Sequence, residues 1–189
     1  MLCTLGRFIF LKKIRVWAGR DRSPPVQRRC GMVDGRAAGV NHVKPYEKLG
    51  RYWGDSEIST ASGCEQIVDG LERKYGVQLP DGFRDYLIHS SPTNDFAFDQ
   101  NFTTWWSLDR IRNIVEEYEH PIRNEVIARD AARYLLFADY SIWCWAWAIA
   151  CGDDENRGRV AVISGDDRFV ADSFSEFVDR YINDFTQVS

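Results

Sequence analysis

The densest hydrophobic pattern in the chain lies at 142–150, where three of the seven tryptophans fall within five residues. Because a β-strand alternates its side chains across the sheet, Trp143, Trp145 and Trp147 would share one bulky face. Cys144 and the neighbouring alanines would form the opposite, thin face. Neither face is polar, so the pattern predicts a strand that is covered on both sides and lies away from the sheet edge.

Shorter apolar segments predict further strands around this one. The segment 134–138 precedes it, and the segments 159–164 and 168–171 follow it. The acidic sequence at 152–156 contains Gly, Asp and Asn and is typical of a hairpin turn. A mixed, aromatic-rich segment at 95–106 is also strand-like.

Two helices joined by a few residues are predicted between 64 and 89. The first carries an apolar stripe from Ile67 to Tyr75 and ends at Gly76, which can adopt the left-handed conformation of a helix C-terminus. The second follows Pro80, which suits the start of a helix. Its expected buried face consists of Phe83, Tyr86 and Leu87.

Two more helices are predicted further along the chain. Ser107 is expected to cap one of them, which Pro121 would stop, and residues 128–132 could add a helical turn. The sequence Ser-Phe-Ser-Glu at 173–176 fits a capping box and begins the clearest helical pattern. We expect this last helix to dock on the alanine face of 142–150. A length of 189 residues favours a single domain.

Charge divides the chain into two unlike parts. Residues 1–31 contain eight basic residues and one acidic one, a net charge of +7, whereas residues 32–189 carry −11. No sustained periodicity appears before residue 50. We therefore interpret 1–50 as a disordered basic arm, or as an extension outside the native domain, and 55–189 as the folded domain. A basic arm could alternatively bind nucleic acid or act as a targeting segment.

Cysteine spacing and hydropathy bear on the compartment. The five cysteines show no paired spacing, which favours a reducing compartment such as the cytoplasm. The longest apolar run near the start is only four residues long, too short for a membrane span or a secretory signal.

Motifs for several kinds of chemistry are absent from the sequence. It contains no phosphate-binding loop, no nucleophile elbow and no His-Glu-x-x-His. A calcium loop opening at Asp153 would place Arg157 at its fifth position and Ser164 at its twelfth, where glutamate is needed. We therefore expect no catalytic residues, no metal and no cofactor. The three histidines are isolated in the sequence: His42, His89 and His120.

The tryptophans and one carboxylate each allow two interpretations. The three clustered tryptophans could stack bases or sugar rings, or could form the wall of a core. Trp105 and Trp106 are adjacent and would point opposite ways, so one of them is a candidate for exposure to a partner. Asp139 could be catalytic or could accept backbone hydrogen bonds in a turn.

Five segments follow one another in a characteristic order: EQIVDGLERKYGVQLP at 65–80, FRDYL at 83–87, WWSLDRI at 105–111, LFAD at 136–139 and VADSFSEFV at 170–178. Together they resemble the SUKH superfamily, the domain of Smi/Knr-type proteins. The sequence departs from the family pattern in two loops. At 90–94 the family usually has Asn followed by Gly residues, and at 140–142 it commonly has a Gly-rich turn.

This resemblance implies an α+β fold in a single domain, with an N-terminal αα-hairpin and a C-terminal helix packed on a curved, mainly antiparallel sheet. It also implies a non-catalytic, protein-binding role. Many bacterial members are similar to immunity proteins that neutralise a cognate toxin, often a nuclease, and fungal members resemble intracellular regulatory scaffolds. An enzyme acting on a stacked sugar or nucleotide is a third alternative.

The expected partner is thus a toxin protein, with no direct nucleic-acid or membrane binding. Acidic turns would steer the domain towards a basic toxin. The residues expected to contact the partner are Trp106, Asp139, Tyr140, Asp153, Asp154 and Glu155.

Overall fold

A six-stranded antiparallel sheet lies at the centre of residues 43–189, the part of the chain that the computed structural model describes. Its strand order is β3-β5-β6-β7-β8, and β4 also pairs with β5. A β-bulge interrupts the pairing of β5 with β6 between Leu136 and Ala138. The strands are β3 (Thr103–Trp105), β4 (Arg112–Asn113), β5 (Tyr134–Tyr140), β6 (Trp145–Ala150), β7 (Val160–Ile163) and β8 (Arg168–Ala171).

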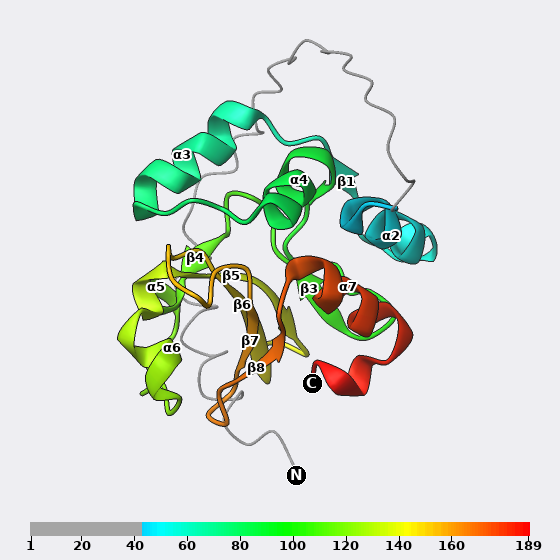
Figure 1. Cartoon of the computed structure of the whole chain (residues 1–189). Helices are drawn as coiled ribbons and strands as arrows, with labels where there is room; N and C mark the ends of the chain where they lie inside the picture. The colour runs from blue at the N-terminus through cyan, green and yellow to red at the C-terminus, as the bar shows by residue number, and fades with distance from the viewer. Residues whose placement is uncertain (1–42) are drawn as a thin grey trace, which may run out of the picture. The chain divides into compact units, whose positions relative to one another are not determined.

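The tryptophan-rich strand is central, as its two apolar faces predict. β6 lies between β5 and β7, and from Ala146 onward all of its residues are buried. Figure 1 shows helices on both sides of the sheet, with α7 (Phe174–Asn183) on one side and α5 (Ile114–Glu117) and α6 (Glu125–Arg129) on the other. The α+β fold with an antiparallel sheet is confirmed.

The C-terminal helix packs on the tryptophan face, so its expected place on the alanine face is wrong. The ring of Trp147 lies 5.8 Å from that of Phe177 and 5.9 Å from that of Tyr181, both edge-on. Aromatic pairs of this geometry bury much apolar area and favour the bulky face as the helix-docking surface. The alanine face instead packs with Ile114 and Ile127, from the short helices α5 and α6.

Trp143 does not share the face of the other two tryptophans. The strand begins at Trp145, and Ser141, Ile142 and Trp143 have φ angles of 43°, 60° and 65°. These left-handed residues break the alternation and turn the Trp143 ring to the opposite face. There it stacks on Tyr118 at 6.0 Å, with 12° between the ring planes.

The predicted αα-hairpin is present as α3 (Glu65–Tyr75) and α4 (Asp81–His89). Gly76 ends α3 with a φ of 60°, and its N–H donates to the carbonyl of Glu72. The buried face of α4 consists of the three expected residues, Phe83, Tyr86 and Leu87. On α3 the expectation fails for Ile67, which is 53% exposed. A small sheet of β1 (Thr60–Ala61) and β2 (Ser91–Pro92) flanks the hairpin.

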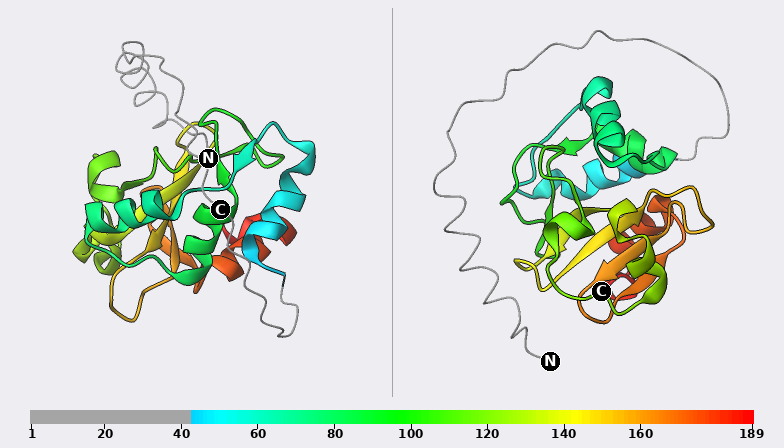
Figure 2. Two further views of the ribbon diagram at one scale, coloured as in Figure 1. Left: turned by 90° about the horizontal axis from the view of Figure 1, so that it is seen from above. Right: turned by 90° about the vertical axis from the view of Figure 1, so that its left-hand side faces the viewer.

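The folded region begins earlier than residue 55. Helix α2 (Pro45–Tyr52) buries Leu49 completely and is followed by η1 (Trp53–Asp55). α2 lies beside α7, as both views of Figure 2 show, and Lys48 forms an ion pair with Asp179 of α7. The interpretation of 45–50 as part of an arm is therefore wrong. The rest of the expected arm, 1–42, lies outside the described residues.

The helix expected after Ser107 begins six residues later. Asn113 caps α5, and its side-chain oxygen accepts from the N–H of Glu116 at 2.8 Å. The N–H of Ser107 instead donates to the Asp95 carboxylate at 2.9 Å, so Ser107 lies in a turn that is linked to the loop before β3. η2 (Ala131–Arg133) follows α6 and accounts for part of the ambiguous segment.

The C-terminal helix begins where the capping box predicts. The hydroxyl of Ser173 accepts from the N–H of Glu176 at 3.1 Å, and the Glu176 carboxylate accepts from the N–H of Asp172 at 2.7 Å. η3 (Phe185–Gln187) follows α7, and the Trp147 indole N–H donates to the carbonyl of Val188 just after it. The C-terminus is thus tied to the central strand.

Candidate functional site

Two of the six expected contact residues lie inside the protein. Trp106 is 0% exposed and Asp139 is 2% exposed. The Asp139 carboxylate accepts from the indole N–H of Trp106 at 2.7 Å and from the Arg110 guanidinium at 3.2 Å. It also accepts from the backbone N–H of Trp143 at 3.0 Å. The expectation that these two side chains face a partner is wrong, because burial of a carboxylate requires such donors and excludes it from the surface.

Arg110 completes this buried cluster. Its guanidinium lies over the Trp106 ring at 4.3 Å, while its other contacts reach the carbonyl of Asp95 and the Asp139 carboxylate. A planar cation suits such combined stacking and pairing. Asp139 therefore fixes the turn between β5 and β6, which agrees with its interpretation as a turn-forming residue rather than a catalytic one.

Tyr140 is half-buried at the end of β5. Its ring stacks on Trp145 at 4.0 Å with 9° between the planes, and Phe185 lies 5.7 Å from the tyrosine ring. The stacked faces leave only part of the Tyr140 side chain available to a partner.

The tryptophans form no stacking platform. Trp147 is 0% exposed, and Tyr140 covers a face of Trp145. Trp143 packs between Tyr118 and Trp106. An enzyme acting on a stacked sugar or nucleotide would need an open cleft beside these rings with converging ionisable groups. The structure instead fills the space beside them with side chains.

The acidic turn between β6 and β7 is exposed. Asp153, Asp154 and Glu155 all lie at the surface, whereas Asn156 and Gly158 are buried. Gly158 has a φ of 91°, a left-handed backbone conformation that glycine adopts without the strain of a side chain. These three carboxylates are the members of the expected contact set that the structure places together at the surface.

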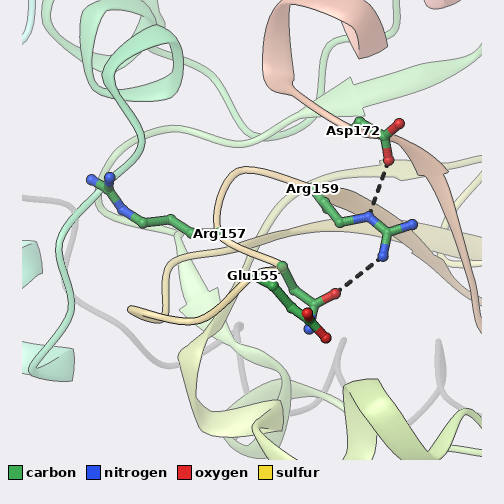
Figure 3. Close-up of a pocket in the computed structure, with 5 residues that line it drawn as sticks. Glu155, Arg157, Arg159 and Asp172 are labelled. Atoms are coloured by element: carbon green, nitrogen blue, oxygen red, sulfur yellow. Dashed lines mark hydrogen bonds and ion pairs between the residues drawn. The ribbon is translucent and has the colours of Figure 1, made fainter.

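An open pocket of about 350 Å³ adjoins this turn. In Figure 3, Arg159 points towards Asp172, while Arg157 points away. The Arg159 guanidinium donates to the Asp172 carboxylate and to the side-chain oxygen of Asn156, both at 3.1 Å. Arg157 donates to the carbonyl of Leu79 at 3.1 Å and so ties the turn to the αα-hairpin. The arginines balance part of the local negative charge. The lining residues are Glu155, Asn156, Arg157, Arg159 and Asp172.

The second acidic turn has a different character. Asp167 is 6% exposed, and its carboxylate accepts from the backbone N–H groups of Ser164, Gly165 and Arg123. Asp166 beside it is exposed and lies 3.7 Å from Arg168. Asp167 therefore holds the turn together, and only Asp166 is available to a partner.

A third buried carboxylate belongs to Asp99. It accepts from the indole N–H of Trp105 at 3.0 Å, from the Tyr181 hydroxyl at 2.5 Å and from the N–H of Thr103 at 3.0 Å. Burial, and next the Asp99 charge, raise the pKa of Tyr181 well above its ordinary value. Tyr181 therefore stays protonated and donates to Asp99, which links the loop before β3 to α7.

Sequence reasoning missed a group of exposed apolar side chains. They lie in the loop before β3 and in the turn between β5 and β6. A visible signal was the setting of the phenylalanines among Asn, Asp and Gln, residues typical of surface loops. The residues are Phe96 (77% exposed), Phe98 (37%), Phe102 (66%) and Ile142 (48%).

Within residues 43–189, no group of three or more His, Cys, Asp or Glu side chains is arranged to hold a metal ion. In the same range, no helix has the length and apolar character needed to cross a bilayer.

Residues 43–189 form an α+β domain in which helices pack on an antiparallel sheet, and its exposed polar and apolar side chains lie in loops and turns. A family model, the SMI1 / KNR4 family (SUKH-1), matches residues 64–180, and the chain belongs to this family. The resemblance stated from the sequence is thus confirmed. A comparison with curated proteins gives no match.

Proposed function

We propose that this domain is a non-catalytic, protein-binding module that serves as an immunity protein and neutralises a cognate toxin, such as a nuclease. The observation that carries the proposal is membership of the SUKH-1 family over residues 64–180. A member that acts by binding needs a folded scaffold with accessible surface features rather than a reaction centre. The acidic turn and the exposed apolar side chains are such features.

Charge supports a basic toxin as the partner. Residues 32–189 carry a net charge of −11, and Asp153, Asp154 and Glu155 project from one turn. A nuclease that grips phosphates needs a basic groove. An acidic domain would be drawn to that groove by long-range attraction and could block it, whereas nucleic acid itself would be repelled. The proposal places this encounter in the cytoplasm, where such a toxin would act.

Co-expression with the toxin encoded beside this gene tests the proposal. We expect the full chain to restore growth and to co-purify with the toxin. Replacing Asp153, Asp154 and Glu155 by their amides should slow association, because three charges are removed from one turn. A variant with Glu57→Gln, Asp109→Asn and Glu119→Gln removes the same charge from exposed positions elsewhere and serves as the control. Failure of the wild type to bind or rescue would refute the proposal.

An intracellular regulatory scaffold of the Smi/Knr type is the second candidate. It is favoured by the description of the matching family, which is named for SMI1 and KNR4. The two candidates differ in gene context and in the toxin assay. A scaffold would show no growth rescue and would have no toxin gene beside it.

A further inference from the structure

An apolar ridge lies at the end of the sheet where β3 begins and β5 turns into β6. We define it by Phe98, Phe102 and Ile142, which are 37%, 66% and 48% exposed. The carbonyl of Phe102 accepts from the N–H of Ser141 at 2.9 Å, so the backbone holds Phe102 beside the turn that carries Ile142. The ridge is therefore a single surface built from two separate segments.

Hydrogen bonds fix Phe98 near the same place. The N–H of Asp99 donates to the carbonyl of Thr103, and the N–H of Phe102 donates to the carbonyl of Asp99, both at 3.0 Å. These bonds reverse the chain, so the residues before Asp99 run back alongside β3. Exposure alternates here, with Ala97 and Asp99 buried and Phe98 exposed. In an extended segment, successive side chains point to opposite sides, so Phe98 points outward while its two neighbours point inward.

The backbone under the ridge is left-handed at residues that are not glycine. Phe102 and Ile142 have φ angles of 57° and 60°, and Ile142 is flanked by Ser141 and Trp143 at 43° and 65°. A β-branched residue in this region is strained, whereas glycine adopts it freely. Strained positions that persist are found preferentially at binding and functional sites. The chain thus exposes two apolar side chains at positions where replacement by glycine would relieve backbone strain.

The ridge carries little charge of its own. Segments 96–104 and 139–147 contain no Lys or Arg, and their two carboxylates, Asp99 and Asp139, are buried. Exposed aromatic and aliphatic side chains without charges are typical of the centre of a protein–protein interface. Phosphate binding would require basic side chains, so the ridge does not suit nucleic acid.

We propose that the apolar ridge is the docking centre for a basic protein partner with an apolar pocket, an inference that rests on the proposed function and names the surface it uses. Charge complementarity selects this partner. Residues 32–189 carry a net charge of −11, which attracts a basic protein and repels the same region of a second copy. The acidic surface steers the partner, and the ridge supplies the short-range contact.

The test uses Ile142→Gly and Phe102→Gly in the full chain. Each change removes an apolar side chain and also relieves a left-handed residue. We expect each variant to lose affinity for the toxin encoded beside this gene by about tenfold or more in calorimetry. We also expect a melting temperature that is unchanged or higher. A merely structural role would move affinity and stability in the same direction. Ile67→Ala, at a position 53% exposed on α3, is the control and should keep wild-type affinity.

The outcomes separate the ridge from the proposed function. If the wild type binds the toxin and both glycine variants bind it equally well, the ridge is not the docking centre, and the immunity function stands. If the wild type does not bind the toxin, the immunity function is refuted, and so is the docking proposal that rests on it. If sedimentation shows a wild-type dimer that Ile142→Gly dissociates, the occupant is a second copy, and this outcome also overturns the proposal.

Discussion

Asp139 illustrates how a residue changes meaning once its distant partners are known. From the sequence it follows an apolar strand and looks available at the sheet edge. In the structure Asp139 is 2% exposed, and its carboxylate is held by Trp106 and Arg110, which lie about thirty residues earlier in the chain. The sequence around Asp139 cannot predict these contacts, because the residues are brought together only by the pairing of β3 with β5.

The cluster predicts a large effect for a small substitution. Asp139→Asn should lower the free energy of unfolding by about 3–5 kcal/mol, because it leaves Arg110 without its buried counter-charge. Urea denaturation measures this change. Asp166→Asn makes the same chemical change at an exposed side chain and should stay within about 0.5 kcal/mol of the wild type. Equal losses for the two variants would contradict the cluster's role.

Alkaline pH should destabilise the fold through its buried tyrosines. Burial, and next the charges of Asp154 and Asp130, raise the pKa of Tyr134 to about 12. The unfolded chain loses this proton near pH 10. The stabilisation is therefore complete below pH 10 and is lost as pH rises to about 12. Denaturation measured between pH 9 and 12 should show that the free energy of unfolding falls less for Tyr134→Phe than for the wild type. An identical loss would contradict the assignment.

At the scale of elements, the sequence predicted those with strong local signals. Ser173 begins α7 as its capping pattern indicates, and Gly76 ends α3. The prediction that Ser107 caps a helix was wrong, because the N–H of Ser107 donates to Asp95 in a turn. The helix is capped by Asn113, which accepts from the N–H of Glu116. Asn is also a common N-cap residue, so the sequence contained this alternative. α2 was missed because its burial depends on contacts with α7 and α4 rather than on a long periodic pattern.

Helix α2 offers two adjacent substitutions with opposite predictions. Leu49→Ala should cost about 2–5 kcal/mol, because Leu49 is fully buried in the main core. Gly50→Ala should stabilise the domain by about 0.5–1 kcal/mol, because Gly50 is helical and a Cβ there would meet nothing within 4 Å. Thermal or urea denaturation measures both. A neutral Leu49→Ala variant would show that α2 is not part of the cooperative core.

At the scale of the whole molecule, charge and surface shape carry the functional account. The net charge of residues 32–189 could be read from the sequence, whereas the arrangement of the candidate site could not. Three of the expected contact residues, Asp153, Asp154 and Glu155, remain together at the surface. The apolar ridge stayed hidden because its members come from separate segments, and because left-handed backbone at Phe102 and Ile142 leaves no periodic signal.

The most direct test of the central claim measures association of the full chain with the toxin encoded beside this gene, at two salt concentrations. The account predicts a stable complex whose association rate falls by about tenfold or more between roughly 50 and 500 mM salt, because opposite charges steer the encounter. Dissociation should change far less, since apolar contacts dominate the bound state. Absence of a complex, or an association rate that does not depend on salt, would contradict the account.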